Sequence, residues 1–140
     1  MNKISQQEMD RVMARLRGSA MKACANAHAV YSQFPVGAAL LCDDGEVFSG
    51  CNVENASYGL TICAERNALA QAVASGVKPG RTEAMLIYTP GDVAHTPCGA
   101  CRQVMQEFLP QDAVVVACCD SEQTRVWTLD QLIPDPFKFS

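Results

Sequence analysis

Residues 36–51 read Val-Gly-Ala-Ala-Leu-Leu-Cys-Asp-Asp-Gly-Glu-Val-Phe-Ser-Gly-Cys. Two mainly apolar runs, 36–42 and 47–51, flank the pair Asp44-Gly45. An Asp-Gly pair between two such runs is typical of a tight β-hairpin turn. The stretch therefore predicts two antiparallel strands, and the elements on either side of it decide what kind of sheet they join.

An amphipathic helix is expected before the hairpin. Apolar residues recur at helical spacing over residues 9–27 and form one stripe. Ser5 is the expected N-cap and Glu8 completes a capping box with it, while Ile4 and Met9 have the spacing of a hydrophobic staple.

Strands and helices alternate after the hairpin. Strands are expected over 84–89, 113–118 and 125–128, and helices over 63–76 and about 98–109, with a helical turn before Pro134. Thr61 is the expected cap of the first of these helices and Gly76 its end, and Thr96 and Pro97 are the expected N-cap and first residue of the second. This order predicts a mixed sheet with right-handed crossover connections.

Size and composition indicate one globular domain over residues 1–140. The chain has a mass of 15.1 kDa, with 49% hydrophobic and 19% charged residues, which is ordinary for a folded domain. The formal net charge of -4, without a run of Lys or Arg, argues against binding to nucleic acid or to an anionic membrane.

Targeting signals and cysteine usage favour the cytoplasm. Residues 1–8 lack the apolar segment of a secretory signal, and the uncharged run 23–42 is interrupted by Asn26, Pro35 and Gly37. Eight cysteines without an export signal are expected to stay reduced. We interpret five of them as structural: Cys24, Cys42, Cys51, Cys118 and Cys119.

The remaining three cysteines form a candidate metal site. Cys98-Gly99-Ala100-Cys101 stands at a predicted helix start, where residues i and i+3 share a face and the helix N-terminus favours thiolates. Cys63 begins the other predicted helix. Three thiolates would fill three corners of a zinc tetrahedron and leave the fourth open, as in catalytic zinc sites.

Glu65 supplies a carboxylate that can take a proton from water held by such a metal. Residues i and i+2 do not share a helix face, so Cys63 has to lie in the first, non-ideal turn. Arg66 and Arg102 follow the two cysteine motifs, and either can donate to the thiolates.

Other interpretations of these residues exist. A C-x-x-C pair is also found in thioredoxin-like redox sites and in structural zinc sites, where Cys51 would be the fourth ligand. His95 precedes Cys98 by three residues, but a loop histidine is more often solvated, so we do not expect it to be a ligand. Phe34 would by default be a core residue, and Asn52 and Glu54 polar strand-end residues.

Four short motifs follow one another along the chain. They are Phe34-Pro35-Val36-Gly37-Ala38-Ala39-Leu40, Asn52-Val53-Glu54-Asn55-Ala56-Ser57-Tyr58, Cys63-Ala64-Glu65-Arg66-Asn67-Ala68 and Pro97-Cys98-Gly99-Ala100-Cys101-Arg102-Gln103. In this order, and over nearly the whole chain, they resemble the small homotetrameric zinc-dependent cytidine deaminases. The chain departs from the family's Ala-Tyr-x-Pro-Tyr-Ser at residues 27–32, where it has His28 and Val30.

The resemblance implies a three-layer α/β/α sandwich around a mixed, mostly five-stranded sheet. It implies one Zn²⁺ per chain, with Glu65 as the catalytic residue and Arg66 beside the ligands. The implied zinc ligands are Cys63, Cys98 and Cys101. The implied substrate-binding residues are Phe34 on the pyrimidine, Asn52 and Glu54 on the ribose hydroxyls, Ala64 at the base edge, Tyr58, and Phe137 in the site of a neighbouring subunit.

The implied reaction is hydrolytic deamination of cytidine and 2'-deoxycytidine to uridine and 2'-deoxyuridine, with release of ammonia, in pyrimidine salvage. Zinc-activated hydroxide attacks C4 and Glu65 shuttles the proton. A deaminase for a nucleoside antibiotic such as blasticidin shares the zinc motif, but the pair Asn52 and Glu54 favours a plain ribose. A polynucleotide deaminase would need a basic channel, against which the net charge of -4 argues.

Overall fold

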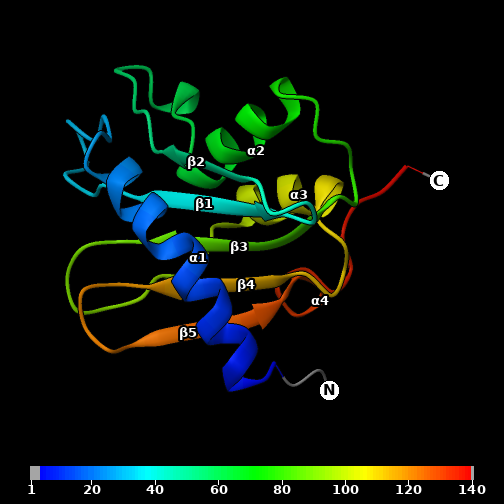
Figure 1. The fold of residues 1–140 in the computed structure, drawn as a ribbon. Coiled ribbons are helices and arrows are strands. Elements are labelled where there is room, and N and C mark those ends of the chain that lie inside the picture. Colours follow the sequence, from blue (N-terminus) through cyan, green and yellow to red (C-terminus); the bar gives the residue numbers. More distant parts are fainter. Residues whose placement is uncertain (1–3, 140) are drawn as a thin grey trace.

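The computed structural model describes residues 4–139 and contains a five-stranded sheet with helices along it (Figure 1). Met1–Lys3, the beginning of the stretch that lacks a secretory signal pattern, lie outside the described residues, as does Ser140. The elements are α1 (Gln6–Cys24), β1 (Gly37–Cys42), β2 (Val47–Cys51), the 3₁₀ turn η1 (Tyr58–Leu60), α2 (Ala64–Ala74), β3 (Thr82–Tyr88), α3 (Gly99–Phe108), β4 (Val114–Cys118), β5 (Thr124–Thr128) and α4 (Leu129–Leu132).

The sheet is mixed, as the order of elements predicts. Its strand order is β2-β1-β3-β4-β5; β3 and β4 are parallel, and the other neighbouring pairs are antiparallel. The β1–β2 hairpin turns at Gly45, whose φ of +91° is a conformation that glycine adopts without strain. The hairpin predicted from residues 36–51 is confirmed.

Helices cover both faces of the sheet, which gives three layers (Figure 1). On one face α1 buries Val12, Leu16 and Ala20 against alternate β1 residues such as Leu41. On the other face α2 and α3 pack with Leu40 and its neighbours. Successive strand residues point to opposite faces, so a strand covered on both faces is apolar throughout, as all six buried residues of β1 are.

The ends of the helices show where sequence signals succeed. The Oγ of Ser5 accepts a 3.0 Å hydrogen bond from the Glu8 backbone N–H, which confirms Ser5 as the N-cap of α1. Ile4 and Met9 both pack on the cluster beneath α1. Gly76, with a φ of +101°, follows the last turn of α2 as expected.

Two cap predictions are wrong. Cys63, not Thr61, is the N-cap of α2, and Cys98, not Thr96, is the N-cap of α3, so Pro97 lies before the helix rather than in it. The Thr96 hydroxyl accepts a hydrogen bond from Arg102 instead, and Thr61 ends the η1 turn. Both helices therefore begin at a cysteine. The first helix, α1, ends at Cys24, so it is shorter than the apolar stripe over residues 9–27 suggested.

None of the helices within residues 4–139 combines the length and the apolar character needed to cross a bilayer.

Candidate functional site

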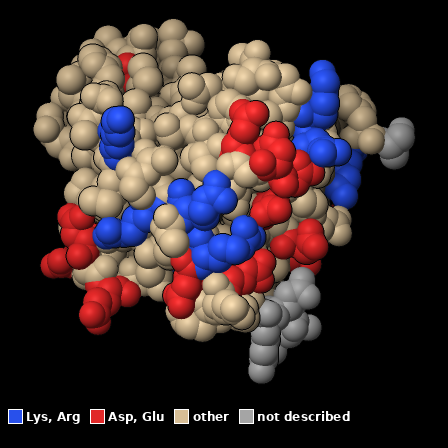
Figure 2. All heavy atoms as spheres, viewed as in Figure 1, with Lys and Arg blue, Asp and Glu red and all other residues tan. Residues whose placement is uncertain are grey.

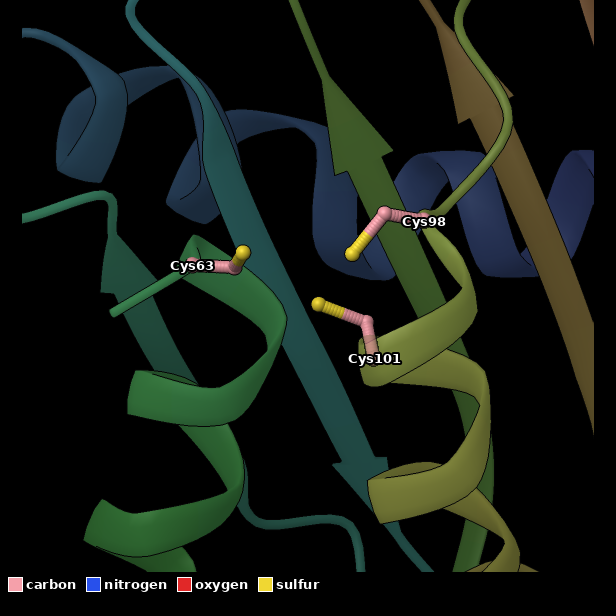
Figure 3. Close-up of side chains that lie close together, drawn as sticks. All are labelled: Cys63, Cys98 and Cys101. Atoms are coloured by element: carbon pink, nitrogen blue, oxygen red, sulfur yellow. The ribbon is translucent and has the colours of Figure 1, made fainter. Parts of the chain in front are cut away.

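Three cysteines meet where α2 and α3 begin (Figure 3). The sulfurs of Cys63, Cys98 and Cys101 all lie within 4.8 Å of one another and point toward a common centre (Figure 3). Cys98 and Cys101 share a face of α3, as the C-x-x-C spacing predicts. Within the described residues this group includes neither Cys51 nor His95, which leaves three sulfur donors rather than a closed set of four.

Cys63 and Cys101 affect each other's ionisation. Hydrogen bonds from Cys101 and Cys98 and the charge of Arg66 lower the pKa of Cys63 to about 5, although burial acts in the opposite direction. The same bond to Cys63, together with burial, raises the pKa of Cys101. One thiolate is therefore formed easily, and a cation would take the place of the remaining protons. Three converging soft donors of this kind fit zinc and leave its fourth position open.

Glu65 lies beside this group and is only 5% exposed. Because Cys63 has an extended backbone at the N-cap position, its side chain and that of Glu65 line the same cavity although they are two residues apart. Burial raises the pKa of Glu65. Cys63 is thus the N-cap residue just before the first turn, rather than part of that turn as expected, and it still faces the same cavity as Glu65.

The two candidate arginines have different surroundings. Arg102 donates to Pro97 O at 2.9 Å, to Leu132 O at 2.9 Å and to Thr96 Oγ1 at 2.7 Å, so it holds the backbone before α3. Arg66 donates to Thr61 O at 2.9 Å, and its charge helps to lower the pKa of Cys63. Its Nε is buried without a partner among the described residues. Arg66 is therefore the arginine beside the thiolates.

A cavity of about 400 Å³ adjoins the cysteines. It brings together most of the residues singled out from the sequence, and others that sequence reasoning missed. Its lining contains Ser32, Phe34, Val36, Asn52, Glu54, Thr61, Cys63, Ala64, Glu65, Ile87, Thr89, His95, Thr96 and Cys98. Phe34 is 43% exposed, so its default interpretation as a core residue is wrong.

Two expected substrate-binding residues lie outside this cavity. Tyr58 lines an adjoining cavity of about 280 Å³, which shares Glu54, Ser32 and Thr61 with the first. Phe137 is 69% exposed and stands beyond α3, where its carbonyl accepts a 3.0 Å hydrogen bond from Gln103 Nε2. Phe137 therefore does not line the cavity of its own chain.

Asn52 and Glu54 brace the loop that carries Phe34. Asn52 Oδ1 accepts from Val36 N at 2.9 Å, and its Nδ2 donates to Phe34 O at 2.9 Å. Glu54 accepts from the Ser32 hydroxyl, from Tyr31 N at 2.9 Å and from Ser32 N at 3.1 Å. These bonds, that of the Ser32 hydroxyl first, lower the pKa of Glu54 and keep it ionised.

His28, one of the two departures from the family pattern, joins this arrangement through its backbone. Its N–H donates to Asn52 O at 3.0 Å, and its carbonyl accepts from Glu54 N at 2.9 Å. These bonds require no particular side chain at position 28, so the loop keeps its backbone partners.

A sequence model of the cytidine and deoxycytidylate deaminase zinc-binding region matches residues 11–118. The matched span includes the three cysteines and Glu65. It also includes two loops that line the cavity, one between α1 and β1 and the other between β3 and α3. The chain belongs to this family. Membership confirms the expected zinc-dependent cytidine deaminase, its zinc cofactor and its three-layer fold, and it argues against a redox module or a structural zinc site closed by Cys51.

Named relatives agree with the family. The cytidine deaminase of Sporosarcina psychrophila is 42% identical over 123 residues, which cover 88% of this chain and 89% of the relative. That of Halalkalibacterium halodurans is 45% identical over 129 residues, covering 92% and 95%. The crystal structure of cytidine deaminase from Burkholderia pseudomallei superposes with a TM-score of 0.82 at 48% identity, covering 86% of this chain and 94% of that one.

The basic side chains of this deaminase family member can be located on the face of the sheet that α1 covers. Figure 2 shows the face that carries α1, where basic side chains gather in the middle and acidic side chains lie in groups on either side of them. Arg11 pairs with Glu83 at 3.1 Å, Arg15 donates to Gly45 O at 2.7 Å and Arg17 donates to Cys119 O at 2.8 Å. These arginines are held by partners within the chain, and α1 covers the sheet face opposite α2 and α3, so these basic side chains lie on the other side of the sheet from the two helices that carry the cysteines.

Proposed function

We propose that this chain hydrolyses cytidine and 2'-deoxycytidine to uridine and 2'-deoxyuridine, with release of ammonia. Water adds to C4 of the pyrimidine and the amine leaves from the same carbon, so no oxidant or further co-reactant is needed. The observation that carries the proposal is the buried carboxyl of Glu65, which lines one cavity together with Cys63 and Cys98.

The catalytic role belongs to Glu65. When bound by Cys63, Cys98 and Cys101, zinc supplies a Lewis acid that makes a water molecule acidic enough to react near neutral pH. Glu65 accepts one proton of the attacking water and passes it to N3 of the ring as the bond between oxygen and C4 forms. It then takes the remaining proton of the new C4 hydroxyl and delivers it to the amine, so that ammonia leaves as the C4 carbonyl forms. Burial raises the pKa of Glu65, which suits a carboxyl that has to hold a proton between two transfers.

The remaining cavity residues recognise a nucleoside in this proposal. Phe34 packs on the flat base, and the backbone of Ala64 bonds the base edge. The amide of Asn52 keeps a second N–H beyond its bond to Phe34 O, and the ionised Glu54 accepts from hydroxyls, so together they bind the ribose. Tyr58 extends this wall in the adjoining cavity. The pair Asn52 and Glu54 favours a plain ribose over the altered sugar of a nucleoside antibiotic.

We also propose that the enzyme acts as a homotetramer in the cytoplasm. Phe137 and Phe139 are 69% and 95% exposed, and Tyr58 and Leu60 near the cavity are 75% and 64% exposed, which suits docking on other subunits. In a tetramer Phe137 would reach the cavity of a neighbour. The eight cysteines are all free, as in a reducing compartment. Light scattering tests the assembly, because a fully active monomer would contradict it.

The decisive experiment follows the ultraviolet absorbance of cytidine mixed with zinc-loaded protein. The wild type should remove the cytidine band, and Glu65→Gln should keep its zinc while losing turnover by several orders of magnitude, because an amide cannot accept the proton. Glu122→Gln, an exposed carboxylate on the β4–β5 turn, is the control and should match the wild type. A near-wild-type rate for Glu65→Gln would refute the role of Glu65, and a silent zinc-loaded wild type would refute the reaction.

A further inference from the structure

Two aromatic rings meet at the wall of the cavity. The rings of His95 and Phe34 lie edge to face, with centroids 5.0 Å apart and planes at 79°. Phe34 comes from the loop between α1 and β1, and His95 from the loop between β3 and α3. Both side chains line the cavity beside the cysteines. His95 is outside the sulfur group, so the metal site does not account for its position.

The backbones beneath the two rings are held independently. On one side, Phe34 N donates to Ser32 Oγ at 3.0 Å, and Asn52 bonds the carbonyl of Phe34. On the other side, Ala94 N donates to Gln123 Oε1 at 2.6 Å, immediately before His95. Each ring therefore rests on a fixed backbone.

The Phe34 side chain is less constrained than its backbone. It is 43% exposed, so core packing does not surround it. An exposed aromatic side chain keeps rotamer freedom that binding has to remove. Contact with the imidazole restricts that freedom before a ligand arrives.

We propose that His95 is a positioning residue for the substrate: its packing against Phe34 holds the phenyl ring as a preformed wall for a flat pyrimidine base. This inference rests on the proposed function. Edge-to-face pairs contribute an amount that corresponds to about a two- to tenfold change in affinity. The contribution should fall on KM, because Phe34 contacts the base in the proposed function and the change at His95 leaves Glu65 and the three cysteines in place.

The test compares kcat, KM and zinc content for cytidine in three variants. His95→Ala should raise KM about two- to tenfold while keeping kcat and zinc. His95→Phe, which retains an aromatic ring but no imidazole N–H, should recover most of that loss. Val93→Ala is the control, because Val93 is in the same loop, is 52% exposed and does not line the cavity. An unchanged KM in His95→Ala, or a loss of zinc, would overturn the inference, and so would a His95→Phe variant as impaired as His95→Ala.

A double-variant cycle shows whether His95 acts through Phe34. In a Phe34→Leu background, His95→Ala should have little further effect on KM, since the ring it positions is gone. Equal effects of His95→Ala in both backgrounds would overturn positioning and indicate direct contact with the substrate. If the wild type turns over cytidine but His95→Ala has equal effects in both backgrounds, the inference is refuted and the proposed function stands. If the wild type is inactive on cytidine, both the proposed function and this inference are refuted.

Discussion

Gly50 of β2 lies directly against Ala68 of α2: a β-carbon at position 50 would stand 2.5 Å from the backbone nitrogen of Ala68. It would also stand 2.7 Å from Ala64 O, in the first turn of the helix. Nearby, Asn67 Nδ2 donates to Cys51 O at 2.8 Å and ties the same helix to the same strand. The missing side chain thus lets α2 approach the sheet, and the start of α2 carries Cys63 and Glu65.

Gly50→Ala should therefore push α2 away from the sheet. We expect the free energy of unfolding to fall by about 1–3 kcal/mol, as for other overpacked cores, and the zinc affinity to fall with it. Thermal unfolding of the metal-free protein and zinc titration measure the two effects.

The matched control for Gly50 is Gly18→Ala. Gly18 is in α1 and a β-carbon there meets nothing within 4 Å. Alanine is favoured over glycine in a helix by about 1 kcal/mol, so this variant should be as stable as the wild type or more stable. If Gly50→Ala also unfolds at the wild-type temperature, the close packing of β2 and α2 does not position the site.

The helices and strands were predicted correctly where a local sequence pattern indicates them. The apolar stripe of α1, the Asp-Gly hairpin and the buried strands are local patterns, and the structure confirms them. The predictions of Thr61 and Thr96 as helix caps were wrong. Threonine is favoured at the N-cap position, but its presence does not determine where a helix begins. The chain leaves extended backbone at Cys63 and Cys98, and that change of conformation fixes where each helix begins.

The candidate site was predictable to the extent that its residues stand in short motifs. Cys98 and Cys101 are related by helical spacing, and the family motifs name Cys63 and Glu65. By contrast, the contact between His95 and Phe34 joins residues 61 positions apart, and it depends on how two loops fold over one cavity. The bonds of Asn52 to Phe34 and Val36 are also long-range, and no spacing signals them.

Removal of one sulfur donor should release the metal. Cys101→Ser is expected to lower zinc content well below one per chain, because an alcohol is a poor replacement for a thiolate on zinc. Cys51→Ala should keep zinc, since Cys51 does not belong to the sulfur group within the described residues. Elemental analysis after dialysis against a chelator measures both, and loss of zinc from Cys51→Ala would support the four-cysteine structural site instead.

Asn52→Ala should disturb the loop that carries Phe34. The change removes the partners of Val36 N and Phe34 O, and an unpaired buried polar group costs about 1–3 kcal/mol. We expect a lower melting temperature together with a raised KM for cytidine. Asn55→Ala is the control, because the 2.8 Å bond from Ser57 N to Asn55 Oδ1 lies within one exposed turn and does not reach the Phe34 loop. An Asn52→Ala variant that melts and binds like Asn55→Ala would show that the loop does not depend on this amide.

Tyr88 and Asp120 should make the stability of the loop before Cys98 depend on pH. The Tyr88 hydroxyl donates to Asp120, and Asp120 also accepts from Gly91 N at 2.9 Å, where that loop begins. The Tyr88 bond lowers the pKa of Asp120, whereas burial and Asp120 raise the pKa of Tyr88 to about 12. The bond joins a protonated phenol to an ionised carboxylate.

The stabilisation from this bond is therefore confined to a pH window. The lowered pKa of Asp120 gives stability above the unfolded value of about 4, which is lost as the pH falls through the folded value. The raised pKa of Tyr88 gives stability below the unfolded value of about 10, which is lost as the pH rises through about 12. Tyr88→Phe should thus be less stable than the wild type at pH 7, and the difference should shrink at about pH 3.

Urea unfolding of both proteins at the two pH values measures this difference. Tyr31→Phe is the control, because Tyr31 is 49% exposed and its ring contacts Tyr58, so its effect should not change between the two values. A Tyr88→Phe deficit of the same size at pH 3 and pH 7 would mean that lost packing of the ring, and not the bond to Asp120, accounts for the destabilisation.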